Sequence, residues 1–232
     1  MKTGLLKTVL LKTFPVMAGY VVLGMGFGIL LKVNGYGVLW ALAMSVFIYA
    51  GSMQFVGISL LTSGASLLSI ALTTLMVNAR HLFYGVSMIE RYKGAGIKKL
   101  YLMHALTDET YSLVCTGDVP EGVDPHKYYF LVSLFNQSYW VLGSVLGSLA
   151  GSIITFDTTG IDFAMTALFV TVFVEQWLTT REHRPALVGV GASVLCLLLF
   201  GSASFLIPAM ITITVILTAM RNPLEKGGVR NE

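Results

Sequence analysis

A short polar run follows the apolar residues 69–77, and its residue types are those that bind anions. It contains Asn78, Arg80 and His81. A guanidinium can hold a carboxylate through two hydrogen bonds, and a histidine titrates near neutrality, so it can relay protons. A charge in such surroundings must pair, extend to a polar surface or line an aqueous cavity. The run predicts a carboxylate site at Asn78 and Arg80. The alternative is an arginine that extends to the surface beside a hydrogen-bonded histidine.

A second polar run lies in the middle of the apolar stretch 37–61. Gly51 and Ser52 are poor residues for a helix interior, and Gln54 brings an amide into apolar surroundings. A helix break there would leave backbone N–H groups free to bind a carboxylate. Gln54 would then orient the ligand, and Phe55 would line an apolar pocket. The alternative is a kink in which Gln54 bonds to a neighbouring helix.

Acidic residues elsewhere in the chain could pair with Arg80 or carry protons. Glu175 lies in the apolar residues 169–177, so we expect it to pair with Arg80 and to join the two halves of the protein. Asp108 and Glu109 lie on a more polar segment, where either could take part in proton coupling.

Metal and enzyme chemistry have no support in the sequence. His104 and Asp108 are four residues apart and would share a helix face, which favours a structural pair because no third metal ligand follows. The chain has no phosphate-binding loop, nucleophile elbow, nucleotide fingerprint or zinc motif. We therefore expect no metal, no other cofactor and no enzymatic activity.

The surrounding sequence must position these groups within a membrane. Hydrophobic residues make up 55% of the 232 residues and charged residues 12%, half of the roughly 25% typical of soluble domains. Mean hydropathy is +0.77. Soluble folds need a polar exterior, so the composition excludes a soluble enzyme, a disordered chain and a nucleic-acid-binding protein. We predict an all-α polytopic membrane protein with about seven transmembrane helices, at residues 14–31, 37–61, 66–89, 128–154, 161–179, 185–200 and 203–220.

We expect residues 1–232 to form one transmembrane domain, with a first half at about 14–90 and a second half at about 127–220. Paired carboxylates are costly in lipid, so segment 97–118 should be an interfacial helix or a piece folded back into the protein. With seven spans and the N-terminus outside, 11 of the 15 basic residues face the cytoplasm, as the positive-inside rule favours. Eight spans with the N-terminus inside is the alternative.

Small residues recur at a spacing of four along two of the predicted helices. Gly24 and Gly28 form one pair, and Gly143, Gly147 and Gly151 form a longer row. This spacing places them on one helix face, where two backbones can approach closely. The face can serve as a sliding surface or as static helix packing.

The segments that carry these glycines are weakly similar to each other. Residues 23–28 match 142–147, and residues 37–55 match 160–177 more loosely. Three predicted spans separate the two copies, so the second copy would be inverted. Inverted three-helix repeats with broken helices form transporter sites near the membrane midplane. Chance similarity between glycine-rich helices is the alternative.

Four motifs, in this order, resemble the AzlC family. They are residues 50–55 (AGSMQF), 60–65 (LLTSGA), 78–84 (NARHLFY) and 107–111 (TDETY). The resemblance is dense from Phe14 to Tyr111 and continues more loosely to Met220. The chain departs from the family pattern at Met53, where a small residue is usual, and at Ala79, where leucine is usual.

The family comprises the large subunits of bacterial branched-chain amino acid exporters. The resemblance implies a multi-pass protein of the bacterial inner membrane that exports leucine, isoleucine, valine or methionine by proton antiport. It also implies a small membrane subunit of the AzlD type as a partner. A channel for small neutral solutes is one alternative function, and an assembly subunit of a transporter complex is another.

An apolar amino acid needs sites for a carboxylate, an ammonium group and a side chain. Residues 51–54 and Arg80 can bind the carboxylate, and Glu175 or Asp108 can bind the ammonium group. The side chain can lie against Phe47, Phe55 and Trp177.

Overall fold

The structure, a computed structural model, describes residues 2–115, 117–153, 170, 173–174, 177–178, 182–201 and 205–220. The chain divides into two compact units, Met1–Ile161 and Asp162–Glu232. All regular elements within the described residues are α-helices, which confirms the all-α class for this part of the chain. The single transmembrane domain over 1–232 stays a prediction, and the two units are described separately.

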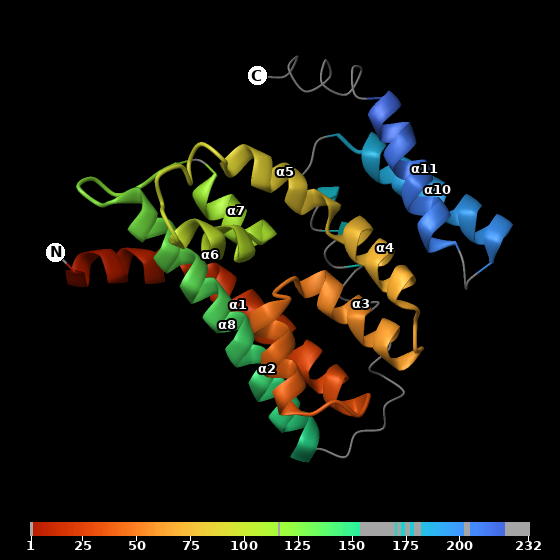
Figure 1. The fold of residues 1–232 in the computed structure, drawn as a ribbon, viewed down its shortest axis with the longest axis horizontal. Helices are drawn as coiled ribbons and strands as arrows, with labels where there is room; N and C mark the ends of the chain where they lie inside the picture. Colours follow the sequence, from red (N-terminus) through yellow and green to blue (C-terminus); the bar gives the residue numbers. More distant parts are fainter. Residues whose placement is uncertain are drawn as a thin grey trace. The chain divides into compact units, whose positions relative to one another are not determined.

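Two long helices, α1 (Lys2–Val33) and α8 (Pro125–Ile153), form the centre of the first unit (Figure 1). At 1.5 Å per residue, α1 is about 48 Å long, which exceeds the hydrocarbon core of about 30 Å. Among the described residues, Gly4–Val33 is the helical segment that is long and apolar enough to cross a membrane by length and composition.

The predicted glycine rows lie where α1 packs on α8. A Cβ atom on Gly24 would lie 2.9 Å from the carbonyl oxygen of Trp140, and one on Gly28 would overlap the carbonyl of Ser144. These distances leave no room for a side chain, so the two backbones are in direct contact. The small residues thus serve helix packing in this structure.

The order of the contacts shows that α1 and α8 run parallel. Gly143 faces Val21, Gly147 faces Met25, and Gly151 faces Ile29 on α1. Both series therefore advance in the same direction. The expected inversion of the repeat is wrong for this pair of helices, because inverted copies would begin with antiparallel ones.

Residues 37–61 form a helical hairpin instead of one broken span. Helix α2 (Val38–Phe47) ends before Tyr49, whose φ of +41° is rare for a residue with a side chain, and α3 (Gly51–Thr62) begins two residues later. Near the turn, Gln54 donates to Ser45 across 3.3 Å. Further along, a Cβ on Gly57 would lie 3.5 Å from Met44. Helix α3 therefore runs back beside α2.

The next two helices continue each other along the chain (Figure 1), with a break at Asn78. Helix α4 (Leu67–Val77) starts after Gly64, whose φ of +60° suits glycine, and Ser66 caps it by accepting from the Ser69 N–H. Helix α5 (Ala79–Met88) leads on toward the N-terminal ends of α1 and α8. The stretch predicted as one span, residues 66–89, is a broken helix.

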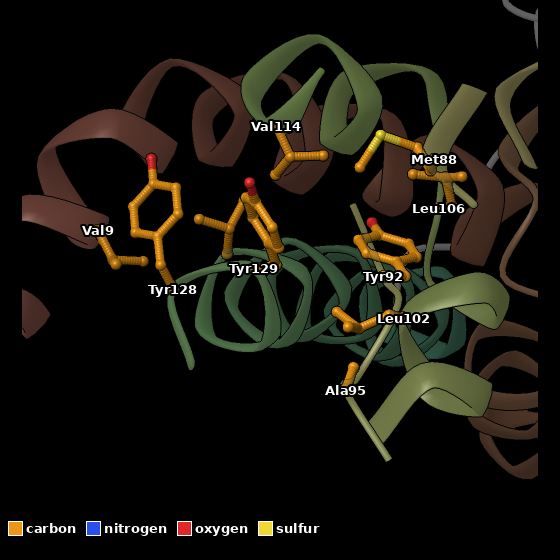
Figure 2. Close-up of a cluster of buried hydrophobic side chains, with 10 residues drawn as sticks. Val9, Met88, Tyr92, Ala95, Leu102, Leu106, Val114, Tyr128 and Tyr129 are labelled. Atoms are coloured by element: carbon orange, nitrogen blue, oxygen red, sulfur yellow. The ribbon is translucent and has the colours of Figure 1, made fainter. Parts of the chain in front are cut away.

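The described residues of segment 97–118 form two short helices that lie against α8. Helix α6 (Lys98–His104) runs along α8 in the same direction. The Lys98 ammonium lies over the Phe130 ring, and further along Tyr101 donates to Gln137 across 2.7 Å. Helix α7 (Asp108–Val114) returns, and its side chain at Val114 reaches the cluster in Figure 2. The two helices form a second hairpin.

A cluster of buried side chains closes the N-terminal end of the first unit (Figure 2). Val9 of α1, Met88 of α5, Val114 of α7 and Tyr128 of α8 meet there, and each is at most 1% exposed. The cluster fixes the ends of four helices relative to one another by burying apolar area.

The second unit contains α10 (Arg184–Phe200) and α11 (Leu206–Ala219), which pack on each other, with Cys196 Sγ 3.9 Å from Thr212 Oγ1. Pro185 occupies the first turn of α10, where its missing N–H is harmless. Most of the predicted span 161–179 lies outside the described residues.

Candidate functional site

Three helices of the first unit begin at one place, halfway along α1 and α8. Arg80 on the first turn of α5 lies between Ser52 on the first turn of α3 and Asp108, the first residue of α7. Neither α3 nor α5 has a side-chain cap at its N-terminus. The free N–H groups of their first turns, together with the helix dipole, favour negative charge nearby.

Arg80 forms the ion pair of this site. Its Nη1 atom lies 2.5 Å from Asp108 Oδ2, and its Nη2 atom donates to Ser52 Oγ across 2.8 Å. The Tyr84 hydroxyl lies close to the same carboxylate. The side chains of Arg80 and Asp108 are 38% and 34% exposed, so the pair is open to one side and is neither fully buried nor a surface pair.

Three shielded polar atoms of Asn78, Arg80 and Asp108 have no hydrogen-bond partner within the part of the chain that the structure describes. They are Asn78 Oδ1, Arg80 Nε and Asp108 Oδ1. Buried polar atoms are almost always paired in folded proteins, and leaving one unpaired costs about 1–3 kcal/mol. One donor and two acceptors thus lack a partner within the described residues, and a ligand that entered between Arg80 and Asp108 could pair them.

A second carboxylate lies in a neutral polar cluster beside the ion pair. Tyr20 of α1 donates to Glu109 Oε2 across 2.6 Å, and its hydroxyl is 2.7 Å from Thr107 Oγ1. Asn136 of α8 donates to Thr110 across 3.0 Å, which extends the cluster. Among the described residues, Glu109 therefore has hydroxyl neighbours and no ion-pair partner, in contrast to Asp108.

Gln54 and Phe55 form the wall behind the site. The indole N–H of Trp140 donates to Gln54 Oε1 across 2.9 Å, and the Gln54 amide donates to Ser45. The ring of Phe55 packs edge-on against Phe27 at 5.7 Å. The Gln54 amide is thus bonded to neighbouring helices, as the alternative interpretation of this residue proposed.

The tips of the two hairpins touch each other. The Val46 carbonyl, at the end of α2, lies 2.9 Å from His104 Nε2 and accepts from Gln137 across 3.1 Å. His104 ends α6, and three residues without helical structure separate it from Asp108. The expected His104–Asp108 pair on one helix face is therefore wrong, because the chain turns between the two residues.

Among the described residues, the partner of Arg80 is Asp108, because segment 97–118 folds back beside α5. Glu175, which the sequence predicts as the partner, lies outside the described residues, so its pairing with Arg80 stays a prediction. The His81 ring is 3.3 Å from the Asn78 carbonyl and packs on Tyr84, as expected of a structural histidine.

Trp177 belongs to the second unit, where its ring stacks on His183 at 4.1 Å. The two residues line a cavity of about 600 Å³ together with residues of α10. The predicted role of Trp177 in the substrate site stays a prediction.

Sequence reasoning missed Tyr20 and Trp140, which contact the site from α1 and α8. Tyr20 lies one turn before the Gly24–Gly28 pair, and Trp140 lies three residues before Gly143. Both occupy the helix face that the glycines mark as buried, and this periodicity is the signal that could have found them.

A helical protein of this composition, with an ion pair and unpaired polar atoms at half the length of its central helices, belongs to the class of membrane proteins. The AzlC protein family matches residues 15–154, from the middle of α1 to the end of α8. The chain belongs to this family.

Several relatives match over nearly the whole chain. The branched-chain amino acid transport protein AzlC of Bacillus subtilis is 46% identical over 94% of this chain and 85% of its own length. Uncharacterized membrane proteins of Helicobacter pylori (strain 26695) and Haemophilus influenzae are 45% and 42% identical, over 92% and 91% of this chain and 93% and 87% of theirs. No solved structure matches the chain.

Proposed function

We propose that the protein is the large subunit of a secondary transporter that exports hydrophobic amino acids such as leucine, isoleucine, valine and methionine. The observation that carries this proposal is the Arg80–Asp108 pair, about one third exposed and next to unpartnered polar atoms at mid-length of α1 and α8. The name of the Bacillus subtilis relative supports the substrate class.

The proposed substrate site comprises Ser52, Asn78 and Arg80, with Gly51 on its wall. A Cβ on Gly51 would lie 3.1 Å from the Trp140 ring, so the glycine lets α3 begin close to α8. Gln54 and Phe55 hold this wall in place from behind. A charged pair that a substrate can reach favours a carrier over a channel, which would use rings of like charge.

Glu109 is the proposed proton carrier. The charge of Asp108 is stabilised by Arg80 at 2.5 Å, whereas Glu109 bonds to the neutral hydroxyl of Tyr20. A carboxyl group among neutral partners can gain or lose a proton without breaking an ion pair. His81 is less suited, because it has the Asn78 carbonyl and the Tyr84 ring as neighbours.

We further propose that the protein acts in the bacterial inner membrane together with a small AzlD-type subunit. Large apolar side chains are exposed along α4 and α5, including Leu68, Leu75, Phe83 and Val86. In a membrane such side chains face lipid or another subunit.

The test is efflux of preloaded labelled leucine, valine and methionine from cells that express the chain with and without the small subunit. We expect efflux that requires both subunits and stops when a protonophore collapses the proton gradient. Efflux that survives this collapse would indicate a channel. Absence of efflux at confirmed membrane expression of both chains would refute the assignment.

Two arginine variants provide the matched comparison. Arg80→Ala should abolish efflux, because it removes the cation of the site. Arg91→Ala should leave efflux unchanged, because Arg91 is exposed and lies beyond the end of α5. Equal efflux by both variants at equal expression would remove Arg80 from the mechanism.

A further inference from the structure

We infer that the Arg80–Asp108 ion pair occupies the place of an amino acid's charged end, and that a zwitterionic substrate opens this pair. The inference rests on the proposed function, because it names the groups that would hold the substrate. It assigns the carboxylate to Arg80 and Ser52, and the ammonium group to Asp108 and Asn78.

The unpartnered atoms match the chemistry of an α-amino acid. An ammonium group only donates hydrogen bonds and a carboxylate only accepts them. The site offers two free acceptors, Asp108 Oδ1 and Asn78 Oδ1, and one free donor, Arg80 Nε. The Ser52 hydroxyl already accepts from Arg80 Nη2, so its own hydrogen is available to a carboxylate.

Charge balance then selects for zwitterions. The Arg80–Asp108 pair has no net charge, and an amino acid inserted between its members leaves the site neutral. A carboxylic acid without the ammonium group would pair Arg80 but leave Asp108 without a cation. An amine without the carboxylate would pair Asp108 but leave Arg80 without an anion. Either case leaves a poorly solvated charge unpaired, which is costly.

The test measures binding of labelled leucine to the protein with its small subunit in lipid nanodiscs. Two competitors each lack one charged group: 4-methylpentanoate has no ammonium group, and 3-methylbutylamine has no carboxylate. We expect each of these compounds to need a concentration at least about tenfold higher than unlabelled leucine to displace the labelled leucine.

Two substitutions should separate the two halves of the site. Asp108→Asn should weaken the binding of leucine about tenfold or more, because it alters the ammonium site. The binding of 4-methylpentanoate should stay unchanged or become tighter, because this compound has no ammonium group. Ser52→Ala should weaken the binding of leucine and 4-methylpentanoate, which carry a carboxylate, and should leave the binding of 3-methylbutylamine unchanged. Asp118→Asn, at an exposed acid outside the site, should behave as the wild type.

A purely structural ion pair would give a different result. Asp108→Asn would then weaken the binding of leucine and of 4-methylpentanoate by the same factor, and Ser52→Ala would change the binding of all three compounds by the same factor. Either result overturns the assignment, and leucine efflux by the wild type would show that the proposed function nevertheless stands. If Asp108→Asn does not fold, the Ser52→Ala comparison alone decides.

The geometry also points to a first unit that crosses the membrane three times, with its N-terminus in the cytoplasm. Because α1 and α8 are parallel, an odd number of crossings must connect them. Helix α3 reverses the direction of α2, and α7 reverses that of α6, so each hairpin heads back toward the end at which it started. The broken helix α4–α5 is then the single crossing between α1 and α8.

Basic residues fix the orientation. The end of the first unit that contains the N-termini of α1 and α8 carries eight of its Lys and Arg residues, and the opposite end carries Lys32 alone. Basic residues concentrate on the cytoplasmic side of membrane proteins, so the first end is cytoplasmic. This reverses the orientation expected from seven continuous spans. The eight residues are Lys2, Lys7, Lys12, Arg91, Lys93, Lys98, Lys99 and Lys127.

Labelling of single cysteines with a membrane-impermeant maleimide tests this topology, in a Cys115→Ser, Cys196→Ser background. Asn34→Cys and Ser63→Cys, which flank the α2–α3 hairpin, should both react in intact cells. Glu121→Cys and Lys127→Cys should react only after permeabilisation. Opposite behaviour of positions 34 and 63 would show that residues 37–61 cross the membrane, and labelling of 121 or 127 in intact cells would refute the orientation.

Discussion

The Trp140 indole donates to Gln54 across 2.9 Å and thereby joins α8 to the first turn of α3. Gln54 is fully buried and Trp140 nearly so. The bond connects the long helix that spans the unit to the short helix that begins at the Arg80 site. The position of Ser52, two residues before Gln54, therefore depends on the contact of Gln54 with α8 in the wall of the site.

Trp140→Phe should lower the free energy of unfolding by about 1–3 kcal/mol, because it leaves Gln54 Oε1 buried without a donor. The measurement is thermal unfolding of the purified protein in detergent. A control replaces both partners, Trp140→Phe with Gln54→Met. It should cost less than the sum of the two single changes, since no polar atom is then left unpaired. Strict additivity would contradict a direct bond.

Gly28→Ala should destabilise the protein, because the added methyl group would overlap the Ser144 carbonyl. Overpacking of this kind costs about 1–3 kcal/mol. Gly26→Ala is the matched control on the same helix, since its Cβ would meet nothing within 4 Å, and alanine favours a helix over glycine by about 1 kcal/mol. Unfolding of the two variants in detergent should therefore shift in opposite directions. A Gly28→Ala protein as stable as Gly26→Ala would refute the close α1–α8 contact.

The sequence identified the centre of the site because its residues are costly in their surroundings. Arg80 within an apolar stretch must have a partner, and Gly51 with Ser52 interrupts a helix. Both features are local and independent of the rest of the fold. The glycine rows on α1 and α8 are equally local, because a spacing of four marks one helix face.

The partner of Arg80 and the course of α3 could not be predicted in the same way. A break at Gly51 is compatible with a helix that continues and with one that turns back. The choice depends on contacts of Gln54 with Ser45 and Trp140, up to 86 residues away in the chain. Asp108 became the partner because α6 and α7 fold back as a hairpin, and charge and depth alone favoured Glu175.

Glu109→Gln should remove the dependence of export on the pH gradient while leaving leucine binding in place. The substitution keeps the size of the side chain and its bond to Tyr20 but removes the titrating group. Leucine efflux is measured at several external pH values with and without a protonophore. Tyr20→Phe, which removes the hydroxyl that donates to Glu109, should keep the dependence on the pH gradient, because the carboxyl group remains. Normal coupling in Glu109→Gln would exclude Glu109 as the proton carrier.

Tyr92→Phe should leave stability unchanged or raise it by about 1 kcal/mol at neutral pH, because the Tyr92 hydroxyl is buried without a partner. Tyr139→Phe should instead lower it by about the same amount, since the Tyr139 hydroxyl lies 3.1 Å from that of Thr13. Unfolding of both variants at pH 8 provides the comparison. Equal effects of the two substitutions would contradict the different environments of the two hydroxyl groups.

The same pair of variants should differ again in alkaline solution. Burial raises the pKa of Tyr92 above its ordinary value near 10, so the folded protein favours the neutral phenol. Its contribution to stability is complete below about pH 10, the pKa of the unfolded chain, and is lost as the pH rises toward the folded-state value. Tyr92→Phe should therefore lose less stability than the wild type between pH 8 and pH 11. A wild type and a Tyr92→Phe protein that lose stability in parallel would show that Tyr92 ionises as easily in the folded chain as in the unfolded one.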